Sequence, residues 1–217
     1  LTCSQRLTMN ESDIYRSWPK AAASIPEQPE IEYPEEKCDW KALWSLPVID
    51  PTAWVSPGVC VLGRVRLKAK SSVWYGCVLR ADGAYIEVGE ETNVQDCSIL
   101  HVEPDLPCIL GRRVTLGHRA TVHSSVVEDG ALIGIGATVL SGCVIGEGAL
   151  VAAGALVLEG MHVPPRTLWA GVPARQIKEL TGEQRERLAL TYRHYVNLGS
   201  LYLRRFGRAR IDALSRR

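Results

Sequence analysis

The sequence lacks any long apolar run: none approaches the ~20 residues that a helix needs to cross a bilayer, and the first residues carry no secretory signal. It also lacks an excess of charge, because its 217 residues sum to a net charge of +1. That balance gives no electrostatic basis for binding nucleic acid or an acidic surface. Since 46% of the residues are hydrophobic, the chain can still bury one sizeable core. We expect a single domain with appendages.

Paired cysteines are absent too. The seven cysteines are an odd number, and no two of them have the CxxC spacing. This pattern argues against a disulfide framework and against a thiolate zinc site. The cysteines are expected to be small buried residues in a reducing compartment.

The sequence does have a period of six. An aliphatic residue recurs at this spacing through most of the chain, a rhythm that fits neither an amphipathic helix nor an alternating strand. It predicts an all-β solenoid, a left-handed parallel β-helix in which each hexapeptide forms one flat side and three close a triangular coil. A β-sandwich would instead need alternation with turn signals every ~8–12 residues. The residues in phase are Val55, Val61, Leu67, Val73, Leu79, Val88, Val94, Leu100, Leu110, Leu116, Val122, Val127, Ile133, Val139, Ile145, Val151, Val157 and Val163.

Three segments are expected. Residues 1–50 carry five prolines and no sustained period, which indicates an extended N-terminal arm. Residues 51–174 form the β-helix, and its glycines, densest between Gly130 and Gly160, suit corner conformations that side chains hinder. Residues 175–217 form a C-terminal helix and a basic tail, the tail being a solvated face, a docking segment or a membrane-surface contact.

The C-terminal helix has a readable beginning and a readable face. Thr181 and Gln184 have the spacing of a capping box. An apolar stripe follows at helical spacing and is expected to lie along the prism or over a subunit junction. Its members are Leu188, Tyr192, Tyr195, Gly199 and Tyr202.

Three histidines lie inside the repeats: His101, His118 and His123. His118 and His123 are five residues apart, which separates them by about 16 Å in extended backbone at about 3.3 Å per residue. Ligands of one metal must bring their donor nitrogens within a few ångström of each other. If all three bind one ion, a neighbouring copy of the fold must supply one of them, so the site would lie between subunits of an oligomer.

Several motifs together resemble the gamma-class carbonic anhydrases, and more narrowly the members of that class found in mitochondrial respiratory complex I. The resemblance spans about Ala53 to Asn197. Hexapeptides alone would be weak evidence because acyltransferases share them, but the order of the other motifs is specific. These are the segment Ser72–Leu79 followed by Arg80-x-Asp82, then Asn93-x-Gln95-Asp96, the three histidines, and Tyr195-x-Asn197.

The resemblance implies a trimer with zinc at each subunit interface. His101 and His123 would come from one subunit and His118 from the next, and the coordination position left open is typical of a catalytic zinc site. Zinc lowers the pKa of bound water to about 7, so that the water can attack carbon dioxide and form bicarbonate. Gln95 would orient the attacking oxygen, and Tyr195 with Asn197 would line the carbon dioxide pocket.

Plainer roles remain open for several of these residues. Arg80 and Asp82 would pair near or across the subunit junction, or form an ordinary structural ion pair. Gln95 could satisfy backbone groups at a corner, and Tyr195 and Asn197 belong to a helix that must pack somewhere. The archaeal members of the class use an acidic loop to export the proton, for which Glu103 and Asp105 are the available substitutes.

Three functions remain as expectations. The first is a complex I subunit in a homo- or heterotrimer with similar chains, on the matrix side of the mitochondrial inner membrane. The second is a free-standing homotrimeric carbonic anhydrase. The third, ranked lower, is a hexapeptide acyltransferase, which needs one histidine and a coenzyme A groove. The chain opens on Leu1 rather than Met, as either a processed precursor or a shortened sequence would.

Overall fold

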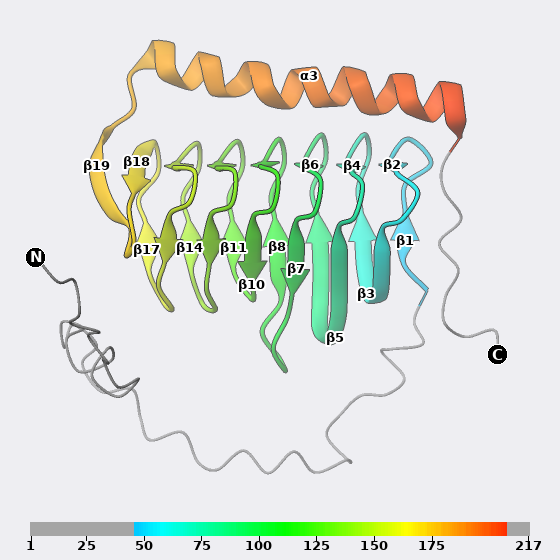
Figure 1. Ribbon diagram of the computed structural model, residues 1–217, viewed down its shortest axis with the longest axis horizontal. Helices are drawn as coiled ribbons and strands as arrows, with labels where there is room; N and C mark the ends of the chain where they lie inside the picture. The colour runs from blue at the N-terminus through cyan, green and yellow to red at the C-terminus, as the bar shows by residue number, and fades with distance from the viewer. Residues whose placement is uncertain (1–45, 208–217) are drawn as a thin grey trace, which may run out of the picture. The chain divides into compact units, whose positions relative to one another are not determined.

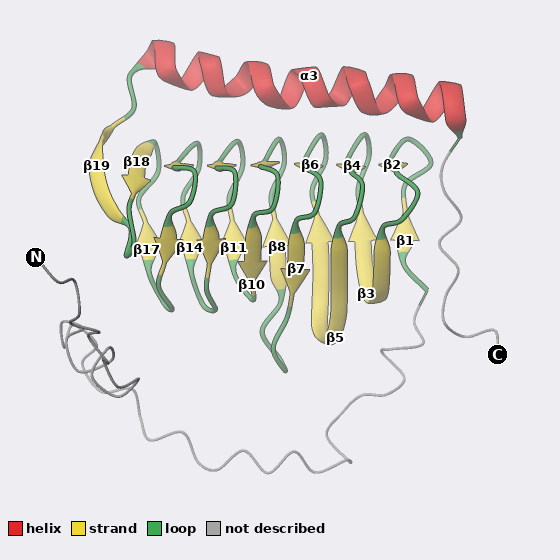
Figure 2. Ribbon diagram, in the orientation of Figure 1, coloured by secondary structure: helices red, strands yellow, loops and turns green. Residues whose placement is uncertain are grey.

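The computed structural model describes residues 46–207. Most of the expected N-terminal arm and the basic tail after Gly207 lie outside the described residues. The described chain is a parallel β-solenoid followed by one helix (Figures 1 and 2). The fold class predicted from the hexapeptide period is therefore confirmed.

One flat side of the solenoid is an eight-stranded sheet, which we call the helix side. Its strands are parallel except for the last pair, β18 and β19, which is antiparallel. In chain order the strands are β2 (Trp54–Val55), β4 (Ser72–Val73), β6 (Asn93–Val94), β9 (Thr115–Leu116), β12 (Leu132–Ile133), β15 (Leu150–Val151), β18 (Thr167–Ala170) and β19 (Arg175–Glu179).

An eleven-stranded sheet makes the other two sides, because its two long strands, β3 (Cys60–Leu67) and β5 (Val78–Val88), each pair along both. The side that we call the histidine side holds β7 (Ile99–His101), β10 (Thr121–His123), β13 (Thr138–Val139) and β16 (Leu156–Val157). The third side holds β1 (Val48–Ile49), β8 (Cys108–Leu110), β11 (Val126–Val127), β14 (Val144–Ile145) and β17 (His162–Val163).

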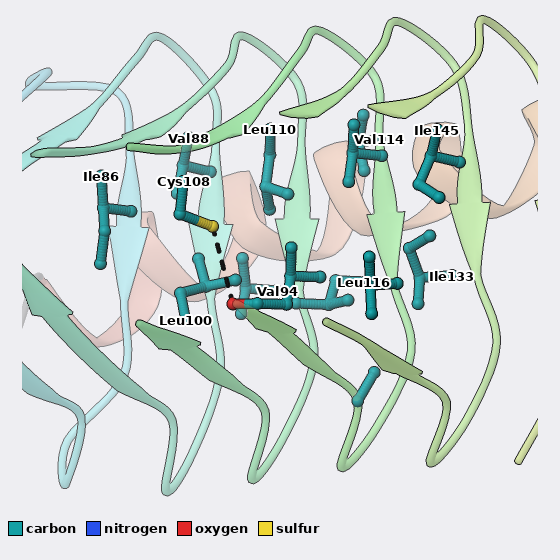
Figure 3. Packing of buried hydrophobic residues seen from close by; sticks show 14 of the residues in the cluster. Ile86, Val88, Val94, Leu100, Cys108, Leu110, Val114, Leu116, Ile133 and Ile145 are labelled. Carbon is teal, nitrogen blue, oxygen red and sulfur yellow. Dashed lines mark hydrogen bonds between the residues drawn. The ribbon is translucent and has the colours of Figure 1, made fainter. Parts of the chain in front are cut away.

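The residues in phase with the period fill the prism. Val94, Leu116 and Ile133 are register partners on successive coils and are fully buried, so like side chains stack along the axis (Figure 3). Each such side chain contributes about 1.5–3 kcal/mol by leaving water. At the corners, Gly130 and Gly136 have φ near +68° and +67°, which is the left-handed conformation that favours glycine.

Helix α3 (Gly182–Phe206) lies along the helix side, against β2, β4 and β6 (Figure 1). Both hydrogen bonds of the capping box between Thr181 and Gln184 are present, as predicted. The helix packs through aromatic pairs: Tyr195 meets Trp74 edge-on with ring centroids 5.4 Å apart, and Tyr202 meets Trp54 at 5.5 Å. Its apolar stripe therefore covers the prism of the same chain.

Candidate functional site

Two of the three histidines lie side by side on the histidine side of the solenoid. Arg80, His101 and His123 are register partners on β5, β7 and β10, one on each of three successive coils. Parallel strands place register partners on the same face, about 4.8 Å apart. The two histidines are 22 positions apart in the chain, and the segment between them includes a loop after β7, closed by a bridge between Glu103 and Leu106. That loop absorbs the residues in excess of one coil.

The two imidazoles face each other closely. Nδ1 of His101 lies 2.8 Å from Nε2 of His123, and the ring centroids are 4.8 Å apart. Partial burial and the nearby charge of Arg80 lower the pKa of His101 below its ordinary value, although Asp82 opposes the shift. The neutral imidazole that results is the form that binds metals.

Asp82 connects His101 to Arg80. Its Oδ1 lies 3.0 Å from Nε2 of His101, and its Oδ2 accepts a hydrogen bond from the Arg80 guanidinium. Burial acts to raise the pKa of Asp82, but Arg80 and His101 outweigh it and the net shift is downward. The ion pair of Arg80 and Asp82 thus forms within one chain. The Asp82 carboxylate also holds one ring nitrogen of His101, as the partners of metal-bound histidines commonly do.

His123 has an equivalent partner. Its Nδ1 lies 2.8 Å from the hydroxyl of Ser141, which donates a hydrogen bond to Glu103 Oε1 at 2.6 Å. Ser141 follows β13, and Glu103 lies in the loop after β7. Ser141 was not among the predicted site residues, because a serine at a repeat corner has no sequence pattern that distinguishes it.

His118 lies apart from the other two, in the turn between β9 and β10 at the corner that joins the helix side to the histidine side. Its Nδ1 lies 2.9 Å from Oδ2 of Asp96, and 40% of its side chain is exposed. Asp96 belongs to the Asn93-x-Gln95-Asp96 motif, which was its only signal in the sequence. A carboxylate therefore also holds one ring nitrogen of His118.

Gln95 and Tyr195 lie near the same corner. Gln95 is only 5% exposed, and its amide donates to Asn93 Oδ1 at 3.0 Å, while Asn93 donates to Thr115 Oγ1. Burial, with a smaller contribution from the Asp96 charge, raises the pKa of Tyr195. Asn197 is exposed on α3. Seven of the eight predicted site residues therefore fall into two groups at opposite edges of the histidine side. The edge next to the loop after β7 holds Arg80, Asp82, His101 and His123, and the edge next to the helix side holds Gln95, His118 and Tyr195. Asn197 forms no hydrogen bond with either group among the described residues.

The residues fit a metal only in part within one chain. Tetrahedral zinc with Zn–N bonds of about 2.0–2.1 Å holds its ligand nitrogens about 3.3 Å apart, so the pair at 2.8 Å would open by only about half an ångström to accept it. Across residues 46–207, however, no group of three His, Cys, Asp or Glu side chains is placed to hold one ion. In this part of the chain, no helix is long and apolar enough to cross a membrane.

Comparison with known proteins finds both carbonic anhydrases and hexapeptide transferases that are similar to this chain. The family described as bacterial transferase hexapeptide (six repeats) matches residues 124–159. A probable carbonic anhydrase of Methanocaldococcus jannaschii is 43% identical over 70% of this chain and 95% of its own length. The mitochondrial gamma carbonic anhydrase 2 of Arabidopsis thaliana is 40% identical over 72% of this chain.

The match with the plant relative covers 58% of that protein, so the chain spans well under two thirds of it. Among solved structures, a putative acetyltransferase of Bacillus cereus matches with a TM-score of 0.71 and 40% identity, covering 72% of this chain and 91% of that one. The fold, the order of the motifs and the extent of these matches agree. The chain belongs to the gamma carbonic anhydrase family.

Proposed function

We propose that this chain is a gamma-carbonic-anhydrase subunit that holds zinc between the subunits of a trimer and hydrates carbon dioxide to bicarbonate. Its place in the cell is the matrix side of the mitochondrial inner membrane, on the membrane arm of NADH:ubiquinone oxidoreductase. His101 and His123 of one subunit and His118 of its neighbour are the ligands.

One observation carries the proposal: each of the three histidines has one ring nitrogen held by an acid or a hydroxyl. Asp82 holds His101, Asp96 holds His118, and Ser141 holds His123. Such partners orient the ring and present its other nitrogen to a metal. Three chance surface histidines would not each be expected to have one.

A second subunit is needed because the three histidines lie at opposite edges of the histidine side. His101 and His123 lie at the edge beside the loop after β7, and His118 lies at the edge next to the helix side. A second copy can bring its own His118 to the pair through a head-to-tail contact, and three such contacts close a ring. The third ligand then has the same environment at every interface.

Bound zinc supplies a polarised water molecule at neutral pH. The residues of this chain position the reactants. The Gln95 amide, fixed by Asn93, is oriented to hydrogen-bond the attacking oxygen. Tyr195 and Asn197 border the space for carbon dioxide. Glu103, which is about half exposed beside the pair of histidines, is placed to receive the proton and pass it to solvent.

The cellular context is supported by the mitochondrial plant relatives at 40–44% identity. It is tested by resolving solubilised mitochondrial membranes on a native gel. Migration of the chain with NADH dehydrogenase activity is expected. Migration only as a free trimer would favour the second candidate, a free-standing enzyme, which the near full-length match to the archaeal relative supports.

The chemistry is tested by measuring zinc per trimer and the rate of carbon dioxide hydration by stopped flow. His118→Ala is expected to lower zinc content and to abolish hydration, whereas His162→Ala, an exposed histidine on the third side, leaves both unchanged. Zinc without hydration would reduce the chain to a scaffold with a residual site. A chain that binds no zinc, but transfers the acetyl group of acetyl-coenzyme A to an amine and releases coenzyme A, would belong with the hexapeptide acyltransferases.

A further inference from the structure

The Ser141 hydroxyl joins three separate coils at the edge of the site. Its oxygen lies 2.6 Å from Oε1 of Glu103 and 2.8 Å from Nδ1 of His123. Glu103 and Ser141 are 38 residues apart in the chain. The contact therefore depends on the stacking of the coils and on the position of the loop after β7.

The donors and acceptors in this chain of contacts can be assigned. A serine hydroxyl has one hydrogen to donate, and a carboxylate can only accept. Ser141 therefore donates to Glu103 and must accept at its own oxygen. The hydrogen in the second contact comes from His123, which is protonated at Nδ1 and keeps its lone pair at Nε2.

Glu103 is itself fixed in place. Its backbone N–H donates to the hydroxyl of Ser124 at 2.5 Å, and the N–H of Ser124 donates to the carbonyl of His101 at 2.9 Å. Ser124 follows His123 directly and is fully buried. The backbone that carries the Glu103 carboxylate is thus anchored by the residue that follows His123.

His101, on the adjacent coil, also has a hydrogen that its partner places. Its Nε2 faces the Asp82 carboxylate, so the hydrogen lies on Nε2 and the lone pair on Nδ1. The two lone pairs therefore point at each other across 2.8 Å. Two acceptors at that distance repel, so a metal ion that both nitrogens bind would relieve the repulsion once the pair opens by about half an ångström.

We propose that Ser141 and Glu103 are positioning residues for the metal: together they hold His123 as the Nδ1–H tautomer, so that Nε2 is always the ligand. This inference rests on the proposed function in that His123 is taken as a zinc ligand. Neither residue touches the metal or the substrate in this role.

The first test measures zinc affinity of the assembled full-length chain by competition with a chromogenic chelator. Ser141→Ala is expected to weaken zinc binding about 10–100-fold, as the loss of an outer partner of a metal-bound histidine does. Ser141→Thr keeps the hydroxyl and is expected to restore the affinity. Ser71→Ala serves as the matched control, because it removes another corner hydroxyl, whose one hydrogen bond within residues 46–207 goes to the Lys68 carbonyl.

The second test reads the tautomer directly, by nitrogen-15 NMR of histidine-labelled protein. The chain has only five histidines, and the spectrum of His123→Gln identifies the signals of His123. At neutral pH, Nδ1 of His123 is expected to carry hydrogen in the zinc-loaded and the metal-free protein. Glu103→Ala frees the Ser141 hydroxyl to donate, so metal-free His123 is expected to shift toward the Nε2–H tautomer.

The outcomes separate this inference from the proposed function. An Nδ1 that carries no hydrogen in the unaltered protein overturns the inference, whether or not zinc binds. Unchanged zinc affinity in Ser141→Ala, or the same tautomer in Glu103→Ala, overturns it as well. If the unaltered chain binds no zinc but shows the expected tautomers, the proposed function fails and the positioning contacts stand as a property of the chain.

Discussion

Gly199 lies against Ser72 so closely that a β-carbon on the glycine would come within 3.2 Å of the Ser72 β-carbon. Gly199 is the one buried residue of α3. The helix packs this closely against the helix side at a position that lacks a side chain. Trp54 and Trp74 then reach Tyr202 and Tyr195 on either side of the contact.

Replacing this glycine should loosen the helix. We expect Gly199→Val to lower the free energy of unfolding by about 1–3 kcal/mol, the usual cost of overpacking, measured by urea denaturation. Leu201→Val is the control, because it places the same β-branched side chain at an exposed position of α3. Equal stability of the two variants would mean that α3 does not pack as described.

A second prediction concerns the corner between the third side and the helix side. Glu91 accepts from Arg113 at 3.0 Å and lies 3.6 Å from the Lys70 amine. Arg113 is the main reason that the pKa of Glu91 falls below its ordinary value, and Lys70 adds to the effect. A depressed folded-state pKa contributes stability above the unfolded-state pKa, and this contribution is lost as the pH falls through the folded-state value.

Glu91→Gln should therefore lower the free energy of unfolding by less than about 1 kcal/mol at pH 7 and should change it hardly at all at strongly acid pH. Urea denaturation at the two pH values measures both effects. Glu147→Gln, whose partner Arg166 is farther away at 3.8 Å and more exposed, is the control. A cost of Glu91→Gln that does not change with pH would show that packing, rather than charge, accounts for it.

A third prediction concerns the acid beside His118. If Asp96 orients this ligand, Asp96→Asn should weaken zinc binding about 10–100-fold with the fold unchanged, measured by chelator competition and circular dichroism. Asp129→Asn is the matched control, because within residues 46–207 the Asp129 carboxylate accepts a hydrogen bond from the backbone N–H of Arg112 and from no other group. If Asp96→Asn binds zinc as tightly as the unaltered chain does, then Asp96 does not orient His118 for zinc binding.

Much of the fold could be predicted from the sequence, because a six-residue period is typical of the three-sided β-helix. Each hexapeptide makes a flat side, so a residue in phase is in the core; Val94, Leu116 and Ile133 are all fully buried. Ile49 lies six residues before Val55 and pairs in register with Leu67, so the period continues upstream of residue 51. β19 carries no period, because all of its residues are exposed.

The position of α3 could not be predicted from the sequence. The apolar stripe shows which face of the helix packs, but not which side of the solenoid that face covers. That choice depends on Trp54 and Trp74, whose outward direction the period does not report. The resemblance already placed His101 and His123 in one subunit, and their spacing of one coil plus a loop allows them to stack. The contacts of Ser141 and Asp96 depend on side chains from other coils, and no local pattern contains them. The zinc ligands remain a prediction.

The final prediction tests whether the metal site is shared between subunits. A chain with His118→Ala keeps the pair His101 and His123, and a chain with His101→Ala keeps His118, so neither should form a site by itself. In every mixed trimer, one interface joins an intact pair to an intact His118. Random mixing in equal amounts makes three quarters of the trimers mixed, so about a quarter of the wild-type sites should return.

Zinc content and carbon dioxide hydration after co-refolding measure this recovery. The control mixes His118→Ala with a chain carrying both substitutions, which can supply no intact His118 and should recover nothing. Because each single variant lacks one ligand within its own chain, recovery can come only from a neighbour. If all three ligands came from one subunit, mixing would leave both zinc and hydration at the level of the separate variants, and the interfacial site would be wrong.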